Sequence, residues 1–384
     1  MSKTREVISS GNELAALAAA DAGCKFYGGY PITPSSEVMH AMSDLMPQRG
    51  GAFVQMEDEI GGICAAIGAS MSGVRSMTAT SGPGISLKAE NIGLAHIAEV
   101  PLVIVDVMRG GPSTGLPTRV QQGDVLQAKN PSHGDLKTIV LCPGNLEECY
   151  TETVRAFNLA DRFMQPVFVL LDETLGHMHG KAIIPTQEEV EKGIKLRKTF
   201  DGDPKDYRPY DVADDEPAVL NPMFKGYRYH LTGLHHGPTG FPTEDAVICD
   251  NLIKRLFKKV DAHVDEIESY EEYLLDDAEY LVFAYGSTAL AAREAVDRLR
   301  KEGVKIGLFR PITLFPSPDK KMRELKEKFG NKVYFAELNM GQYVEAFERA
   351  TGMHRDEFVT HFKANGRPIS PAEMIEKMKA ELLK

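Results

Sequence analysis

The stretch Gln55-Met-Glu-Asp-Glu-Ile-Gly-Gly-Ile-Cys-Ala-Ala-Ile-Gly-Ala-Ser-Met-Ser-Gly73 joins a short apolar strand to a helix built of small, mostly apolar residues. Three acids, Glu57, Asp58 and Glu59, stand where the strand turns into the helix. Small residues let a helix pack closely on its neighbours, so we expect a carboxylate at its start to lie against a poorly hydrated surface. Acids in a first helical turn also complement the helix dipole, by about 0.3–1 kcal/mol each, so this pattern alone leaves their function open.

Short apolar strands alternate with helical patterns around this stretch, which is typical of an α/β fold with a mainly parallel sheet between helices. We expect strands over residues 25–30, 52–55, 75–79, 101–108, 139–142 and 166–171. We expect helices over 12–22, from about Glu37, from a glycine-rich turn at 80–85 to Ala98, and over 146–159. These elements form a predicted first domain of residues 1–185.

The second half of the chain changes character twice. Residues 186–245 are rich in proline, aspartate, tyrosine and glycine without a clean period, and the aromatic residues indicate an ordered excursion, since disordered linkers carry few of them. Connecting helices with an apolar stripe are expected over 246–275. A smaller α/β domain is predicted over 276–384, with strands over 280–285, 305–309 and 332–337 and helices over 289–301, 318–329 and 371–383.

Composition excludes several classes of protein. The chain has 384 residues and a net charge of -11, which argues against a general nucleic-acid or anionic-membrane binder. Its five cysteines are scattered, without the close pairs that zinc and iron–sulfur sites favour. The N-terminus lacks the apolar run of a signal peptide, and no segment approaches the roughly 20 apolar residues of a membrane span. We therefore expect a cytoplasmic protein.

Ligands of open parallel sheets bind at the carboxyl ends of strands, where loops begin at Tyr30, Glu57 and Arg109. In the first loop, Tyr30-Pro-Ile-Thr-Pro-Ser-Ser36, the prolines prevent regular strand pairing, and Ser35 or Ser36 can cap the following helix. Thr33 is held between two prolines, which suits either a substrate contact or a turn.

Arg109 begins the most promising of these loops. Two glycines follow it, and the hydroxyls of Ser113, Thr114 and Thr118 come next. A guanidinium binds a carboxylate in bidentate fashion, hydroxyls add neutral donors, and glycines let the backbone approach closely. The pattern is suited to a small anion, although an arginine that simply ends a strand remains the alternative.

Other candidate sites are weaker. Ser81-Gly-Pro-Gly84 could hold a phosphate through backbone N–H groups, but it matches neither the P-loop nor Gly-x-Gly-x-x-Gly and can be an ordinary turn. His177, His179, His235 and His236 lack a third ligand at metal spacing, which favours structural or solvent-exposed roles.

Four ordered motifs resemble the α subunit of 2-oxoacid:ferredoxin oxidoreductases, and in particular the form that acts on 2-oxoglutarate. The motifs are Tyr30-Pro-Ile-Thr-Pro-Ser-Ser36, Gln55-Met-Glu-Asp-Glu-Ile-Gly61, Thr80-Ser-Gly-Pro-Gly-Ile-Ser-Leu87 and Arg109-Gly-Gly-Pro-Ser-Thr-Gly-Leu-Pro-Thr118. Three later segments resemble the second domain of that family, which is related to the transketolase C-terminal domain. They are Tyr285-Gly-Ser, Arg310-Pro-Ile-Thr-Leu-Phe-Pro316 and Glu337-Leu-Asn-Met-Gly-Gln342.

The resemblance implies a thiamine diphosphate enzyme that converts 2-oxoglutarate and coenzyme A to succinyl-CoA and CO2 and passes the electrons to ferredoxin. Residues 1–185 would then be the domain that faces the cofactor's pyrimidine ring. A separate β subunit with a Gly-Asp-Gly motif, which is absent from this chain, would hold the diphosphate and Mg²⁺. A γ subunit and a ferredoxin-like chain with iron–sulfur clusters are the other implied partners.

The resemblance also assigns residues. Glu59 falls on the catalytic glutamate, which hydrogen-bonds the pyrimidine N1′ and favours the imino tautomer, while Glu57 and Asp58 become helix-start charges. The implied cofactor-binding residues are Tyr30, Pro31, Glu59 and Gly82. The implied substrate-binding residues are Thr33, Arg109, Ser113, Thr114 and Thr118, without a decision on which one binds the distal carboxylate of 2-oxoglutarate.

Two alternatives remain at this point. Closely related subunits that share the Tyr-Pro-Ile-Thr-Pro loop act on branched-chain 2-oxoacids, so the substrate could differ. The chain could also be a noncatalytic scaffold subunit with a degenerate thiamine-type fold. The electron acceptor, the subunit stoichiometry and the favoured direction of the reaction are not decided by the sequence.

Overall fold

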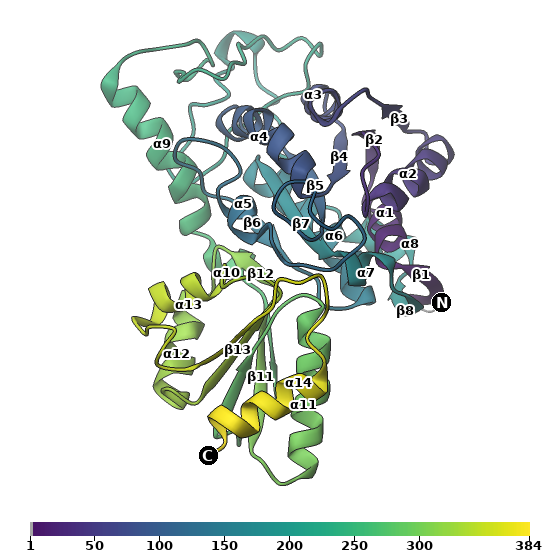
Figure 1. The fold of residues 1–384 in the computed structure, drawn as a ribbon. Coiled ribbons are helices and arrows are strands. Elements are labelled where there is room, and N and C mark those ends of the chain that lie inside the picture. The colour runs from purple at the N-terminus through teal and green to yellow at the C-terminus, as the bar shows by residue number, and fades with distance from the viewer. Residues whose placement is uncertain (1–2) are drawn as a thin grey trace.

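Three β-sheets organise residues 3–384, the part of the chain that the computed structural model describes (Figure 1). The largest has seven strands in the order β12-β6-β7-β5-β4-β2-β3. Six of them run parallel, and the short β12 pairs antiparallel with β6. Their bounds are β2 (Cys24–Gly29), β3 (Ala52–Gln55), β4 (Arg75–Thr80), β5 (Leu102–Met108), β6 (Ile139–Leu141), β7 (Pro166–Asp172) and β12 (Thr313–Phe315). The predicted α/β fold is confirmed.

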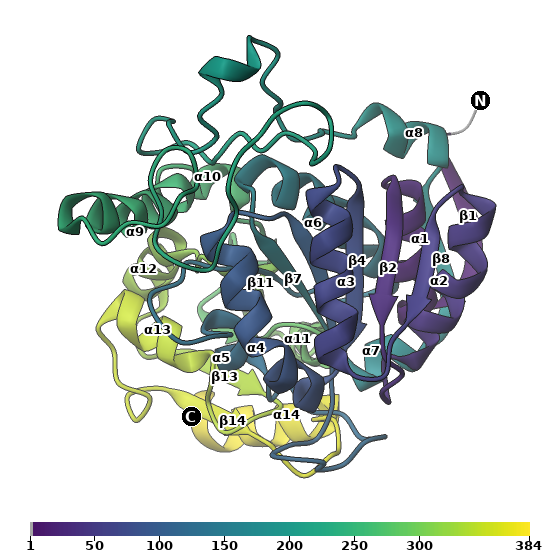
Figure 2. The same cartoon turned by 90° about the horizontal axis from the view of Figure 1, so that it is seen from above.

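Helices cover both faces of this sheet, and alternate strand residues supply two separate cores. Val103 and Val105 of β5 pack with one set of helices, while Leu102 and Ile104 pack with the other. A strand that is buried on both faces needs apolar residues throughout, which explains the continuous apolar run. The first set is α1 (Gly11–Asp21), α2 (Ser36–Gln48) and α6 (Leu146–Phe163), and the second is α3 (Glu59–Met71) and α4 (Gly82–Ile97) (Figure 2).

Glycines bring α3 unusually close to the end of β2. A Cβ atom on Gly62 would lie 3.0 Å from the Cα of Gly29, and one on Gly28 would lie 2.6 Å from the carbonyl oxygen of Gly62. No larger side chain fits between this helix and this strand. The small residues of the Gln55 to Gly73 stretch therefore position the start of α3, where Glu59 lies, at the carboxyl edge of the sheet.

The first unit of the structure is built around the seven-stranded sheet, and the second is built around a five-stranded sheet in the order β14-β13-β10-β11-β9. The second unit lies below the first in Figure 1. Four strands are parallel, and β9 is antiparallel to β11. The strands are β9 (Tyr270–Tyr273), β10 (Tyr280–Phe283), β11 (Ile306–Pro311), β13 (Val333–Glu337) and β14 (Val359–Phe362). The helices are α11 (Thr288–Lys301), α12 (Asp319–Phe329), α13 (Val344–Thr351) and α14 (Pro371–Lys377), and a π-helical turn follows over Met378–Leu382.

The segment between the two units has little regular structure but is well packed. Phe200, Tyr207 and Tyr227 form mutual ring contacts with centroids 5.2–5.9 Å apart, and the Tyr210 hydroxyl donates to the carbonyl of Ala98 at 3.2 Å. These contacts account for the ordered excursion that the aromatic residues predicted. Figure 2 shows the segment looping outside the sheet between α8 and α9. The short elements are α8 (Gln187–Lys192), a 3-10 turn (Pro204–Asp206), α9 (Ala246–Asp261) and α10 (Val264–Ile267).

Several expectations are corrected. Residues 270–273 form strand β9 instead of continuing the predicted helices, because they pair antiparallel with β11 at the edge of the second sheet. Ser35 precedes α2 but gives it no side-chain cap, since its hydroxyl donates to the carbonyl of Ile32 at 2.9 Å. The elements not predicted are β1 (Thr4–Ser10), β8 (His179–Pro185), α5 (Val125–Lys129), α7 (Glu173–His177), α13, β12 and β14.

The domain division at residues 185 and 276 stays a prediction. One strand crosses it, because β12 follows β11 in the chain but extends the first sheet beside β6. Within residues 3–384, no helix combines the length and apolar character that crossing a bilayer requires.

Candidate active site

The loops that follow β2, β3, β4 and β5 meet at one edge of the first sheet, because these strands are parallel and adjacent. Tyr30 follows β2 and Arg109 follows β5, while Glu59 and Gly82 are the first residues of the helices that the other two loops lead into. The three loops that the sequence proposed as competing sites therefore lie side by side, and a fourth, from β4 to α4, joins them.

Burial separates the three acids at the start of α3. Asp58 is the N-cap, and its Oδ1 accepts a hydrogen bond from the Gly61 N–H at 2.7 Å. Glu57 and Asp58 are exposed to solvent, whereas the next residue, Glu59, is only 5% exposed. Across residues 3–384, no group donates a hydrogen bond to the Glu59 carboxylate. A buried carboxylate without a donor is available to a ligand.

Helix α4 makes room for that carboxylate. A Cβ atom on Gly84 would lie 2.9 Å from both Cγ and Oε1 of Glu59, and 1.9 Å from Oγ1 of Thr80. The predicted glycine-rich turn at 80–85 is therefore wrong in detail, since Gly82 already begins α4 and Gly84 lies within the helix. Ser81 is its N-cap residue, yet the buried Ser81 hydroxyl caps no N–H and has no partner in the described chain.

Arg109 lies at the end of β5 and holds the first loop. Its Nη1 donates to the main-chain carbonyl of Thr33 at 2.7 Å, and the side chain is 7% exposed. Burial lowers the pKa of Arg109, and the nearby carboxylates of Asp124 and Glu59 oppose that shift. The buried Nε has no partner among the described residues, so one donor of a charged guanidinium remains free.

A cavity of about 340 Å³ opens beside Arg109. Three predicted site residues, Gly82, Arg109 and Ser113, line it. Thr33 reaches Arg109 through its main chain, while its side chain is exposed. The remaining predicted residues do not line the cavity: Glu59 is buried against Gly84, Thr114 and Thr118 are exposed, Tyr30 is 37% exposed and Pro31 is half-buried.

The cavity also has polar lining residues that the sequence analysis missed: Gln121, Asp124, Gln127 and Gln342. Gln342 belongs to the second unit, and its side-chain amide donates to the Gly123 carbonyl at 2.6 Å and accepts from the Leu126 N–H at 3.0 Å. The run Gln121-Gln122-Gly123-Asp124 directly after the Arg109 loop was a signal for this side of the cavity. Gln342 ends the segment Glu337-Leu-Asn-Met-Gly-Gln342, and only tertiary packing brings it to this cavity.

Two aspartates lie close together on this side of the cavity: Asp106 is buried, and Asp124 is half-buried and lines the cavity. Burial and the neighbouring Asp124 raise the pKa of Asp106 well above its ordinary value, and burial raises the pKa of Asp124 to about 6. A Cβ on Gly82 would lie 2.8 Å from Oδ1 of Asp124, so the carboxyl packs against the start of α4. The pKa of Asp106 is thus raised by burial and by its neighbour, while Asp124, with a pKa of about 6, is mostly charged at neutral pH close to Arg109.

Asp124→Asn is expected to change how stability depends on pH. Asp124 binds its proton more tightly in the folded protein than when unfolded, so it favours folding at low pH, and this contribution is lost as the pH rises through about 6. Relative to wild type, the variant should gain about 1–2 kcal/mol more at pH 8 than at pH 5. Urea unfolding at both pH values measures this, with the exposed Asp135→Asn as control. An equal difference at both pH values would contradict it.

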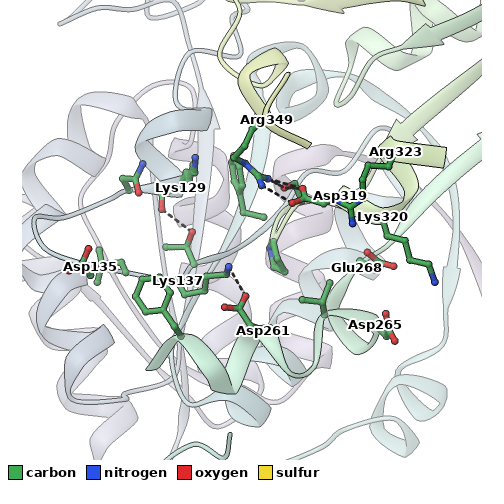
Figure 3. Close-up of a pocket in the computed structure, with 18 of the residues that line it drawn as sticks. Lys129, Asp135, Lys137, Asp261, Asp265, Glu268, Asp319, Lys320, Arg323 and Arg349 are labelled. Atoms are coloured by element: carbon green, nitrogen blue, oxygen red, sulfur yellow. Dashed lines mark hydrogen bonds and ion pairs between the residues drawn. The ribbon is translucent and has the colours of Figure 1, made fainter. Parts of the chain in front are cut away.

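A larger cavity, of about 610 Å³, lies between residues 134–138, the connecting helices and the second unit (Figure 3). None of the predicted site residues lines it. Four of its charged residues pair with one another, Arg349 with Asp319 at 2.7 Å and Lys137 with Asp261 at 2.6 Å. The smaller cavity, with its unpaired buried donor and acceptors, is the stronger candidate for a substrate site.

Two family models match the chain. Residues 17–254 match the model described as pyruvate flavodoxin/ferredoxin oxidoreductase, thiamine diP-bdg. Residues 278–374 match pyruvate:ferredoxin oxidoreductase core domain II.

Individual relatives are similar along the whole chain. The 2-oxoglutarate synthase subunit KorA of Methanocaldococcus jannaschii is 42% identical over 95% of this chain and 96% of its own length. The ketoisovalerate oxidoreductase subunit VorB of Methanothermobacter thermautotrophicus is 39% identical over 96% of each chain. A solved 2-oxoglutarate:ferredoxin oxidoreductase from Magnetococcus marinus, with 2-oxoglutarate, coenzyme A and succinyl-CoA bound, superposes with a TM-score of 0.91 at 33% identity. The match covers 98% of this chain and spans 65% of that one.

Proposed function

The chain belongs to the 2-oxoacid:ferredoxin oxidoreductase family, and we propose that it is the α subunit of a thiamine diphosphate-dependent enzyme that oxidises 2-oxoglutarate to succinyl-CoA and CO2. The observation that carries the chemistry is the buried Glu59 carboxylate, which no described residue bonds and which Gly84 leaves room for. Four relatives named 2-oxoglutarate synthase subunit KorA, at 40–42% identity, support the substrate.

The residues at the sheet edge fit the pyrimidine end of the cofactor. Glu59 would share a proton with the ring nitrogen N1′, and its burial strengthens such a hydrogen bond. Tyr30, Pro31 and Gly82 are the proposed neighbours of the ring. When bound, thiamine diphosphate supplies the carbon nucleophile and the electron sink that decarboxylation of a 2-oxoacid requires.

Arg109 would bind a carboxylate of the substrate. Its Nε has no partner among the described residues, and the side chain lines a cavity of about 340 Å³, a volume suited to a small ligand. Ser113 adds a hydroxyl from the same loop. The neighbouring Asp124 is a carboxylate beside the guanidinium and would have to share it with the substrate. Thr33, Thr114 and Thr118 remain proposed contacts from the loops around this cavity.

The chain is proposed to work only within a complex. A β subunit would supply the diphosphate site and Mg²⁺, and further γ and ferredoxin-like chains would carry coenzyme A binding and the iron–sulfur clusters. Ferredoxin is the proposed electron acceptor, and the cytoplasm is the proposed location.

A substrate panel tests this function. The chain, coexpressed with its β partner, is assayed for 2-oxoacid-dependent viologen reduction with 2-oxoglutarate, 2-oxoisovalerate and pyruvate. We expect kcat/KM to be at least about tenfold higher for 2-oxoglutarate, because a site that binds two carboxylates leaves a polar or charged group unpaired when the substrate has only one. A preference for 2-oxoisovalerate would support the function of the VorB relatives instead. A complex that neither binds thiamine diphosphate nor turns over would indicate a scaffold.

A further inference from the structure

Lys88, in α4, is a buried lysine that no role described above uses. Its side chain is 0% exposed. Its Nζ donates to the main-chain carbonyl of Glu59 at 3.0 Å and to Oγ1 of Thr78 at 3.2 Å. Within residues 3–384 it forms no ion pair, so both of its partners are neutral oxygens. A buried charge without a paired counter-charge costs free energy, so we expect this lysine to have a role besides packing.

The position of Lys88 relates it directly to Glu59. Gly84 and Lys88 are four residues apart and therefore share one face of α4. Gly84 lies against the side chain of Glu59, and Lys88 against its backbone. Thr78, in β4, holds the ammonium from the side of the sheet. The first turn of α3 is thus fixed by α4 at two points.

The ionisable groups around Lys88 lie in or next to α3 and on β5. Burial lowers the pKa of Lys88 to about 8, and the opposing influences are Glu59, then Asp58 and Cys64, all in or next to α3. On β5 the ionisable group on this face is Asp106, whose pKa is raised by burial and by Asp124. Thr78 of β4 does not titrate, and β7 presents apolar residues to this core. Glu59 is therefore the carboxylate with the largest influence on this ammonium.

We propose that Lys88 is a positioning residue for Glu59: it fixes the main chain at the start of α3 and places a positive charge beside the carboxylate that meets the cofactor ring. This inference rests on the role proposed for Glu59. Lys88 does not line the substrate cavity, and because its side chain is completely buried it does not contact a ligand there. It acts through Glu59, so its loss affects turnover and cofactor binding more than the affinity for the 2-oxoacid.

Lys88→Met in the assembled complex tests the inference, because methionine keeps the length of the side chain and removes the charge. We expect kcat to fall about tenfold with little change in KM for the 2-oxoacid, since a small displacement of a catalytic group is costly. The dissociation constant of thiamine diphosphate, measured by calorimetry, should rise several-fold. In wild type kcat should also decline as Lys88 loses its proton above about pH 8, and this decline should be absent in the variant.

Two further variants separate the possible failures. Thr78→Val removes one acceptor of Lys88 while keeping the charge, and it should weaken cofactor binding even if Lys88→Met does not fold. The inference would be overturned by unchanged kcat, cofactor affinity and pH profile in Lys88→Met. If only Thr78→Val folds, unchanged cofactor affinity in that variant would overturn it. If Glu59→Gln is inactive in the same assay while the Lys88 and Thr78 variants are unchanged, only the role of Lys88 is overturned. Turnover that survives in Glu59→Gln would overturn the role of Glu59 and, with it, that of Lys88.

Discussion

Glu59→Gln in the assembled complex is expected to lower kcat for 2-oxoacid oxidation by about 10²–10⁴-fold, the range that a positioned acid–base group contributes. Glutamine has the same shape, so it keeps the contact with Gly84 and the fold at the start of α3. It cannot share a proton with a ring nitrogen as a carboxylate does. Viologen reduction measures the loss, and calorimetry with thiamine diphosphate separates lost chemistry from lost binding.

Glu57→Gln is the matched control for this experiment. Glu57 lies two residues earlier, carries the same charge and is exposed to solvent, so its substitution should leave kcat within about twofold of wild type. Near-normal turnover in Glu59→Gln would remove Glu59 from the catalytic role. An equal loss in both variants would point to a general effect of charge at the start of α3.

Arg109→Ala should lower kcat/KM by about 100-fold, mostly through a higher KM, because a hydrogen bond to a charged group contributes about 1.5–3 kcal/mol. The guanidinium is buried: its Nη1 donates to the Thr33 carbonyl, and its Nε has no partner among the described residues. A group at the surface therefore cannot take its place. Initial rates over a range of 2-oxoglutarate concentrations give both constants.

Two variants show whether that loss concerns the substrate. Arg119→Ala removes an exposed arginine from the same loop and should leave both constants unchanged. Arg109→Lys keeps the charge but not the forked donors, and should give an intermediate KM. If Arg109→Ala has normal kinetics, Arg109 does not bind the substrate. If it loses kcat alone, its role is to hold the Thr33 loop.

Much of the first sheet could be predicted from the sequence. The strand over 52–55 has the expected bounds, and the helix at 146 begins where expected. The strand at 166 also begins where expected, because a strand buried on both faces is a continuous apolar run. The elements that were missed carry no such signal. β1 alternates exposed and half-buried residues in a two-stranded sheet, β9 contains two glutamates, and β12 has three residues.

The candidate site was predictable to the extent that it lies within local motifs. Glu59 and Arg109 were found from their surroundings, and the structure adds that both are buried. Lys88 could not be found, because a lysine between small and polar residues in a helix is usually solvated. Gln342 approaches the Arg109 loop only after the second unit has packed against the first. Such contacts depend on tertiary structure and leave no periodic pattern.

The strand β12 restricts how the protein can move. It is hydrogen-bonded into the first sheet although its neighbours in the chain belong to the second unit, and the Gln122 side chain bonds to Tyr285 and Thr288 across the same boundary. A hinge would have to break these backbone and buried bonds each time it opened. We therefore expect the two units to move together. We also expect access to the proposed substrate site to depend on the exposed loop at 111–119 and not on domain closure.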